Sequence, residues 1–244
     1  MLEKLLRILF PTFCIGCDQY GEILCKKCER FLYRTNPECI YCRKIHNKYV
    51  THESCQKEEH IISVAYTCFI YNWLGKRVMK KLKFEGARNM EVLLLKNLSF
   101  QISEISKSLK SDGQPTFIIP IPLHRKRLVD RGYNQIDFFA KFLADQDIGS
   151  KLDNLLIKVQ NSKSQSHKTL DERAYEGENP FTINLSASPY STKNKDPAFI
   201  IVDDVITTGN TLIMASRALK AQFPNATIKA IALFRPVFKG EKPV

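Results

Sequence analysis

The stretch FIIVDDVITTGNTL, residues 199–212, decides the fold of this chain. Its four opening apolar residues, Phe199 to Val202, predict a buried strand of a parallel sheet. Two carboxylates, Asp203 and Asp204, follow, and small hydroxylated residues then lead into a segment with apolar residues at helical spacing. The order of strand, acids, loop and helix predicts an α/β domain with a parallel sheet and helices on both faces.

The loop after the acids has the chemistry of an anion site. The unpaired N–H groups of a first helical turn and the helix dipole both favour a bound anion. The threonines add hydroxyl donors, and Gly209 lets the backbone approach closely. The loop lacks the lysine of a Walker A sequence and the three glycines of a dinucleotide site. A plain alternative is a doubly wound domain whose strand ends in two acids before a helix cap.

The same stretch resembles the phosphoribosyl-pyrophosphate (PRPP) loop of type I phosphoribosyltransferases, in which an apolar strand and two acids precede T-T-G-x-T. The resemblance implies that Asp203 and Asp204 hold the ribose hydroxyls as the catalytic acids, with Mg²⁺ accompanying PRPP. It also implies that the loop wraps the 5′-phosphate. The loop residues are Val205, Ile206, Thr207, Thr208, Gly209, Asn210 and Thr211.

The first sixty residues hold paired cysteines at the spacing of zinc ligands. The first group is C-x2-C-x7-C-x2-C, and the second is C-x2-C followed by H-x2-C. We expect one Zn²⁺ site of four cysteines and a second of three cysteines and a histidine. Both look closed and therefore structural. The predicted ligands are Cys14, Cys17, Cys25 and Cys28, then Cys39, Cys42, His52 and Cys55.

A disulfide framework is the competing interpretation of these cysteines. The segment LEKLLRILF near the N-terminus is too short and too charged for a signal-peptide core, so we expect no export and reduced thiols. His46 and His60 are weaker substitutes for His52, because neither lies at the paired spacing. Cys68 lies in an apolar stretch and is expected in the core.

The length and composition of the chain are sufficient for two structural parts. The 244 residues, 44% of them hydrophobic, suffice for a small zinc module, residues 1–60, and an α/β domain, residues 61–244. No run of eighteen apolar residues exists, so we expect no membrane insertion and a cytoplasmic protein. The net charge of +12 attracts polyanions without choosing among them.

Residues 73–88, WLGKRVMKKLKFEGAR, predict a helix with one apolar stripe and a broad cationic face. With Trp73 and Tyr71 at its start, this face is a candidate platform for stacking bases and contacting phosphates of single-stranded DNA. An ordinary solvated surface is the alternative. The cations predicted to bind DNA are Lys76, Arg77, Lys80, Lys81 and Lys83.

A third stretch, FIIPIPLHRKRLVDRGYNQ at residues 117–135, joins a short strand to a dense cationic loop. Prolines 120 and 122 stop the strand from continuing. Ligands of open α/β sheets bind at the carboxyl ends of strands, so this loop and the PRPP loop can face one ligand. Arg125, Arg127 and Arg131 are the predicted pyrophosphate-binding residues, because arginine offers several donors in a fixed fork.

The pattern P-I-P-L-x-R-x-R-x-x-x-R-G-Y-N-Q resembles the ComF family of competence and DNA-utilisation proteins. Those proteins join an N-terminal zinc ribbon to a phosphoribosyltransferase-like domain, and the resemblance covers nearly the whole chain. It includes residues 164–181, where Gln165 and Arg173 match the family pattern and imply a mobile loop closing over the site. His52, where a cysteine is common, is a departure from the family.

Three functions follow from these resemblances. The first is a cytosolic DNA-uptake factor in natural transformation that binds single-stranded DNA and Mg·PRPP, with a helicase of the uptake machinery as a partner. The second is an active phosphoribosyltransferase, a pentosyltransferase whose acceptor base or nucleotide fragment the sequence does not identify. The third is a PRPP-responsive interaction protein.

Overall fold

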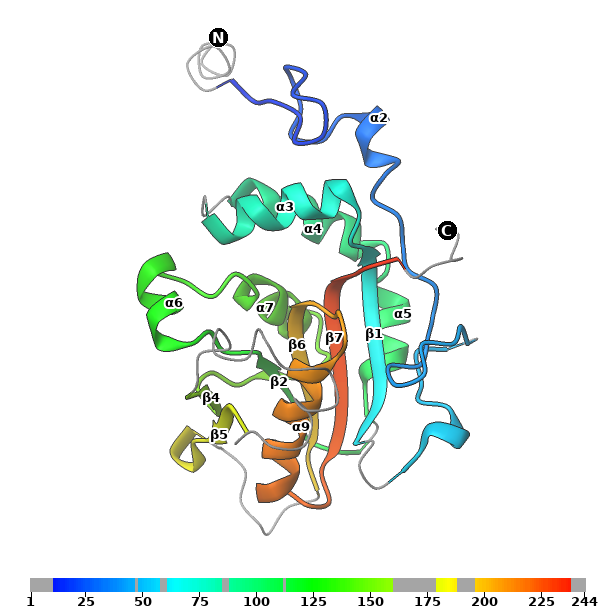
Figure 1. The fold of residues 1–244 in the computed structure, drawn as a ribbon, viewed down its shortest axis with the longest axis vertical. Helices are drawn as coiled ribbons and strands as arrows, with labels where there is room; N and C mark the ends of the chain where they lie inside the picture. Colours follow the sequence, from blue (N-terminus) through cyan, green and yellow to red (C-terminus); the bar gives the residue numbers. More distant parts are fainter. Residues whose placement is uncertain are drawn as a thin grey trace, which may run out of the picture.

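A computed structural model describes residues 11–46, 48–57, 61–84, 88–111, 113–159, 179–187 and 196–237. Its centre is a five-stranded sheet in the order β1-β7-β6-β2-β3, and every neighbouring pair is parallel (Figure 1). The strands are β1 (Ile62–Ile70), β2 (Thr116–Pro120), β3 (Ser150–Lys151), β6 (Ala198–Val205) and β7 (Thr227–Arg235). The expected α/β fold with a parallel sheet is confirmed.

Helices cover both faces of the sheet. One core cluster joins Ile200 and Val202 of β6 to the helices that follow β1 and β2, whereas Phe199 and Ile201 pack on the opposite face. This alternation follows from the two-residue period of a strand. The helices are α3 (Trp73–Phe84), α4 (Arg88–Ser99), α5 (Ile102–Leu109), α6 (Arg125–Arg131), α7 (Asp137–Asp145) and α9 (Asn210–Gln222).

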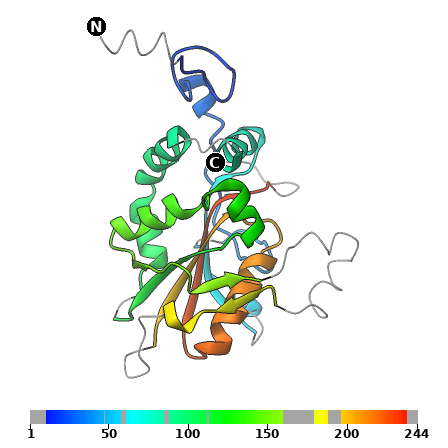
Figure 2. The same ribbon diagram turned by 90° about the vertical axis from the view of Figure 1, so that its left-hand side faces the viewer.

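A small antiparallel pair stands apart from the main sheet, as Figure 2 shows. It consists of β4 (Leu156–Lys158) and β5 (Phe181–Ile183), and a short 3₁₀ turn, Leu185–Ala187, follows it. The segment between the two strands contains the predicted mobile-loop residues Gln165 and Arg173, which lie outside the described residues.

The cationic stretch after β2 was predicted to be a loop, but it forms a helix. The ring Nδ1 of His124 accepts a hydrogen bond of 3.3 Å from the Lys126 N–H and caps the first turn of α6. At the other end Gly132, with φ +75°, adopts the left-handed conformation that commonly ends a helix. Two short-range caps therefore turn this segment into a seven-residue helix.

The cysteine-rich segment packs on the α/β domain in two places (Figure 1). Its first part, with α2 (Lys26–Glu29), lies over α3, and Cys14, Ile15 and Cys28 join the core cluster on that side. Its second part, with a 3₁₀ turn at Glu53–Cys55, contributes Ile40 to the core cluster on the opposite side. Cys68 is fully buried in β1.

Candidate functional site

The predicted phosphate loop connects β6 to α9. β6 runs on through both aspartates to Val205, and α9 begins at Asn210. Between them Ile206 is buried and anchors the loop, whereas Thr207 and Thr208 are exposed. Gly209 has φ +83°, a backbone conformation that residues with a side chain rarely adopt. This accounts for a glycine at this position.

The two aspartates lie at the carboxyl end of β6, and Asp204 is held from two sides. Its Oδ2 atom lies 2.6 Å from the Lys83 ammonium and accepts a hydrogen bond of 2.8 Å from the Gln135 amide. The Asp203 carboxylate accepts a 2.8 Å bond from the backbone N–H of Asp204. Three distant segments of the chain therefore meet at this acid pair.

Burial and, after it, the neighbouring charge of Asp204 raise the pKa of Asp203 to about 7. Lys83 and Lys158 oppose this rise by favouring the charged carboxylate. Burial also lowers the pKa of Lys158. Near neutral pH, Asp203 is therefore balanced between its protonated and ionised forms.

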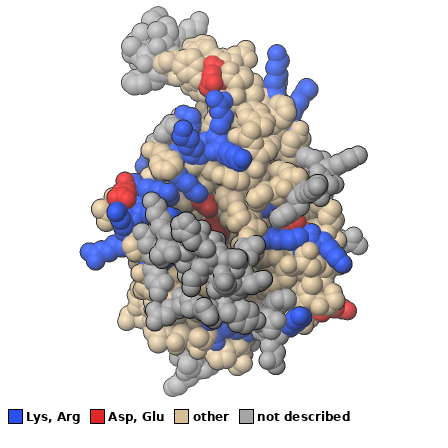
Figure 3. Space-filling view, in the orientation of Figure 1, with Lys and Arg blue, Asp and Glu red and all other residues tan. Residues whose placement is uncertain are grey.

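A cavity of about 200 Å³ lies beside the acid pair and is lined by positively charged side chains. Arg131 donates a 2.7 Å hydrogen bond to Gln135, which in turn donates to Asp204. The arginine head also lies 5.4 Å from the centre of the Phe84 ring. Figure 3 shows acidic atoms in a hollow with Lys and Arg side chains around it. The charged and hydrogen-bonding residues that line the cavity are Lys83, His124, Arg127, Arg131, Gln135, Lys158, Asp203, Asp204 and Thr211.

The structure divides the three predicted pyrophosphate-binding arginines. Arg127 and Arg131 line the cavity of the acid pair, whereas Arg125 lines a neighbouring cavity of about 500 Å³. Both cavities share Lys158, at the end of β4. The position of Lys158, at the end of an apolar run, had indicated a phosphate contact from the sequence. Gln135 was not among the predicted site residues, and its one sequence signal is that it closes the arginine-rich stretch.

The cations predicted to bind DNA differ in their contacts. Lys76 and Lys80 are exposed on α3, and Lys81 is half-exposed. Lys83 instead points to Asp204. Arg77 donates hydrogen bonds of 2.9 Å and 2.5 Å to the carbonyls of residues 15 and 16 in the first cysteine group.

An aromatic pair lies at the start of α3. The rings of Trp73 and Phe31 meet edge to face with centroids 5.4 Å apart, and both remain substantially exposed. Phe31 belongs to the cysteine-rich segment, so the pair joins the two parts of the chain. Tyr71 packs instead against Phe234, with ring centroids 5.8 Å apart.

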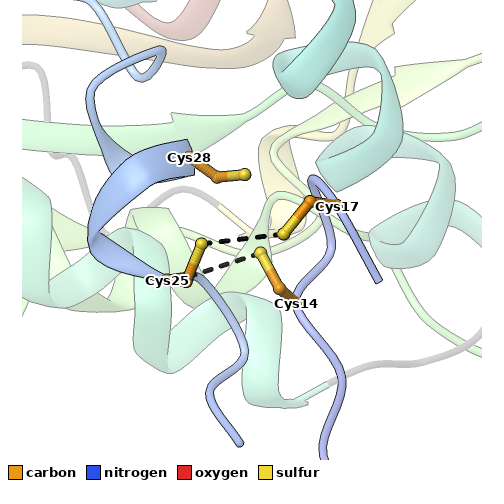
Figure 4. Close-up of side chains that lie close together, drawn as sticks. All are labelled: Cys14, Cys17, Cys25 and Cys28. Carbon is orange, nitrogen blue, oxygen red and sulfur yellow. Dashed lines mark hydrogen bonds between the residues drawn. The ribbon is translucent and has the colours of Figure 1, made fainter. Parts of the chain in front are cut away.

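The first four predicted metal ligands converge (Figure 4). The sulfurs of Cys14, Cys17, Cys25 and Cys28 point toward one another and lie within 4.8 Å of each other. The Cys17 and Cys25 sulfurs are 3.7 Å apart, close to the separation of about 3.8 Å that tetrahedral geometry with Zn–S bonds of about 2.3 Å requires. This group could hold a metal ion, and four sulfur ligands suit zinc.

The thiols of this group have opposed pKa shifts. Burial opposes ionisation of Cys14, but backbone N–H donors led by that of Cys25 lower its pKa to about 6. Burial and the neighbouring Cys17 raise the pKa of Cys28 to about 12. A divalent cation removes this conflict, because it stabilises all four thiolates together.

The second four predicted ligands also converge. The ligand atoms of Cys39, Cys42, His52 and Cys55 lie within 4.8 Å of one another, and the Cys42 sulfur is 3.1 Å from His52 Nδ1. His52 therefore completes the group, as the spacing predicted, and His46 is not part of it. This group could likewise hold zinc.

None of the helices in the described part of the chain has the length and apolarity that a membrane crossing needs.

Comparisons with known proteins agree with this architecture. Residues 139–243 match the phosphoribosyl transferase domain family. Competence protein F of Haemophilus influenzae is 26% identical over 216 residues, which cover 86% of this chain and 92% of that protein. Competence protein ComFC of Bacillus subtilis is 26% identical over 234 residues, covering 88% and 85%. DNA utilization protein YhgH of Salmonella typhi is 28% identical over 145 residues, covering 58% and 59%. The resemblance inferred from the sequence is confirmed.

Proposed function

We propose, from its homology to the ComF-type competence proteins and its phosphoribosyl transferase domain, that this chain is a cytoplasmic DNA-uptake factor. It binds single-stranded DNA on α3 and Mg·PRPP at the loop between β6 and α9. One observation carries the proposal: the acid pair, the phosphate loop and several positively charged side chains line one cavity at the carboxyl end of β6.

The PRPP half of the proposal rests on complementary chemistry. The ribose diol can donate hydrogen bonds to Asp203 and Asp204, and the 5′-phosphate suits the threonine-rich loop at the start of α9. Arg127, Arg131 and Lys83 line the same cavity and supply positive charge for the pyrophosphate, with Mg²⁺ neutralising the remainder. The predicted residues Gln165 and Arg173 remain candidates for a closing loop.

The DNA half rests on the exposed side of α3. Lys76 and Lys80 provide phosphate contacts, and the exposed Trp73–Phe31 pair provides a surface on which bases stack. Arg77 is engaged with the first cysteine group and in this proposal holds that group in place. Zinc bound there keeps Phe31 beside Trp73, so the metal is structural.

Fluorescence anisotropy of a labelled single-stranded oligonucleotide tests the proposal, with zinc-loaded protein over a salt series. The affinity should fall with salt by a log–log slope of about −0.7 for each phosphate neutralised. Repeating the titration with saturating Mg·PRPP reports whether the two sites are linked. Absence of DNA binding at moderate salt would refute the DNA half.

A second candidate function is a phosphoribosyltransferase, which the raised pKa of Asp203 favours. A carboxyl group with a pKa of about 7 is suited to proton transfer near neutral pH. The positively charged residues that line the cavity can stabilise a departing pyrophosphate. This candidate requires pyrophosphate release from PRPP with some base, and loss of that release in Asp204→Ala. Failure of a full panel of bases to support turnover would eliminate it.

A further inference from the structure

We propose that Arg43, in the second cysteine group, fixes the shape of the phosphate loop, so that metal binding at that group and Mg·PRPP binding at the loop strengthen each other. The inference rests on the proposed function for its ligand. It starts from a contact between two parts of the chain that are 164 residues apart, in which Arg43 Nη2 donates a 2.8 Å hydrogen bond to the Thr207 carbonyl.

The two cysteine groups begin with the same turn. In the first, the Cys14 N–H donates to the carbonyl of Gln19 over 2.8 Å, and in the second the Cys39 N–H donates to that of Lys44 over 3.1 Å. The residue after the second cysteine has positive φ in both turns, +58° at residue 18 and +62° at Arg43. Each turn therefore presents one side chain from an equivalent, sterically restricted backbone position.

These equivalent positions contact different functional elements. Asp18 forms an exposed ion pair of 3.3 Å with Arg77 on α3. Arg43 instead forms a pair of 3.0 Å with the Glu38 carboxylate, whose side chain is 5% exposed, and reaches the phosphate loop with its other nitrogen. The first turn thus holds the proposed DNA helix, and the second holds the proposed PRPP loop.

The contact between Arg43 and the loop is supported from behind. Glu38 also lies 3.4 Å from the Nε atom of Arg235, a fully buried side chain at the end of β7. A continuous series of charged groups therefore runs from the sheet through Glu38 and Arg43 to Thr207. Because Glu38 and Arg235 are buried, solvent screens their interaction little.

An apolar contact accompanies the polar one. Ile40, between the cysteines of the second turn, belongs to the same core cluster as Ile206 and Leu212. A Cβ atom placed on Gly209 would lie 3.5 Å from Ile40 and 3.6 Å from the Arg43 guanidinium. The second turn therefore lies beside Gly209, at the end of the loop where α9 begins.

Holding the Thr207 carbonyl also orients a donor. In a planar trans peptide the C=O and the following N–H point in opposite directions, so the N–H of Thr208 faces away from Arg43. Backbone N–H groups arranged in this way form anion-binding loops. Arg43 thus acts as a positioning residue that presets the loop for phosphate.

Metal binding acts on Arg43 through the preceding residue, because Cys42 belongs to the second ligand group. A metal ion that ties Cys39, Cys42, His52 and Cys55 together restricts the turn that carries Arg43. If the metal favours the loop shape that binds PRPP, PRPP must favour metal binding by the same factor. Coupling between two sites typically amounts to roughly 5- to 150-fold.

The test uses the full zinc-loaded chain and compares Arg43→Ala with Lys44→Ala. Lys44 is an exposed cation of the same turn, so its removal changes the charge equally without touching the loop. Calorimetric titration of Mg·PRPP should show a loss of at least roughly 5-fold in affinity for Arg43→Ala and no change for Lys44→Ala. Arg43→Lys, which keeps the charge but not the fork, should fall between them.

Zinc release provides the reciprocal measurement. Saturating Mg·PRPP should slow the transfer of one of two zinc ions to a chromogenic chelator in the wild-type protein, and not in Arg43→Ala. Free PRPP can only strip metal, so slower release reports on the protein itself. Equal PRPP affinity in the two alanine variants, or zinc release that PRPP does not slow, would overturn the inference.

A third measurement separates this inference from the proposed function. Hydrogen exchange of residues 206–213 without PRPP should be faster in Arg43→Ala than in Lys44→Ala, because the loop loses its anchor. If wild-type protein fails to bind PRPP, the proposed function is refuted and this measurement still decides whether Arg43 holds the loop. Equal exchange in both variants refutes the positioning role.

Discussion

Replacing Lys83 with methionine removes the cation that lies 2.6 Å from Asp204 and keeps most of the side-chain length. The acid pair then carries more negative charge and repels the polyanion PRPP. The pKa of Asp203, about 7 in the wild type, should rise further, because Lys83 at present opposes its protonation.

The size of the effect follows from the exposure of the pair. Hydrogen bonds to charged groups contribute about 1.5–3 kcal/mol, and solvent screening reduces this value for exposed pairs. The Lys83 and Asp204 side chains are 26% and 13% exposed, so screening reduces the contribution of this pair to about 1–2 kcal/mol. The affinity for Mg·PRPP, measured by calorimetry, should therefore fall by about 5- to 30-fold.

Lys80→Met is the matched control, because Lys80 lies about one turn earlier on α3 and is exposed. This variant should keep its affinity for Mg·PRPP and bind single-stranded DNA more weakly, with a salt slope reduced by about 0.7. Equal affinity of Lys83→Met and the wild type for Mg·PRPP would refute a role of Lys83 at the acid pair. An equal loss of DNA affinity in the two variants would also contradict that role.

Three further predictions concern other parts of the molecule. The raised pKa of Asp203 means that the wild type loses folding stability as pH rises from about 4 to 7, because the unfolded carboxyl ionises first. Thermal denaturation should accordingly show Asp203→Asn stabilising the protein more at pH 8 than at pH 5, and equal shifts would contradict the assignment. Gly16→Ala places a Cβ 2.5 Å from the Cys28 sulfur, so elemental analysis should find one zinc fewer per chain than in the wild type. Trp73→Ala should weaken DNA binding by about 1–3 kcal/mol in the anisotropy assay, whereas Phe100→Ala, which removes another exposed aromatic ring, should not.

The phosphate loop could be predicted from the sequence because its chemistry is local. Strand, acids, loop and helix follow one another within residues 199–212, and the structure keeps that order. The ligand groups were predictable for the same reason, since paired cysteines at fixed spacing bring neighbouring thiols together. The position of His52 relative to Cys55 distinguished it from the other histidines.

The place of Lys83 could not be predicted, because it depends on a long-range pairing. β1 adds to the sheet beside β7, and this pairing brings the end of α3 to the acids of β6. The helical pattern of α3 showed which residues are apolar, but not which of its cations would face another part of the domain. Arg77, bound to the first cysteine group, illustrates the same limit.

The helix at residues 125–131 was missed because the charge density of the segment suggested a loop. A histidine cap and a glycine after the last turn were both present in the sequence. The helix that they delimit places Arg125 in the lining of one cavity and Arg127 and Arg131 in the lining of another. Side chains two residues apart on a helix point in different directions, which is why Arg125 lines a different cavity from Arg127 and Arg131.

Calorimetric titration of Mg·PRPP into zinc-loaded protein tests the central claim most directly, with Asp204→Asn beside the wild type. The proposed site predicts saturable binding of one PRPP per chain, which weakens at least roughly tenfold in Asp204→Asn, the effect of losing about 1.4 kcal/mol. The zinc content of the variant should match that of the wild type, since Asp204 lies outside both ligand groups. Absence of saturable binding, or equal affinity in the two proteins, would contradict a PRPP site at the acid pair.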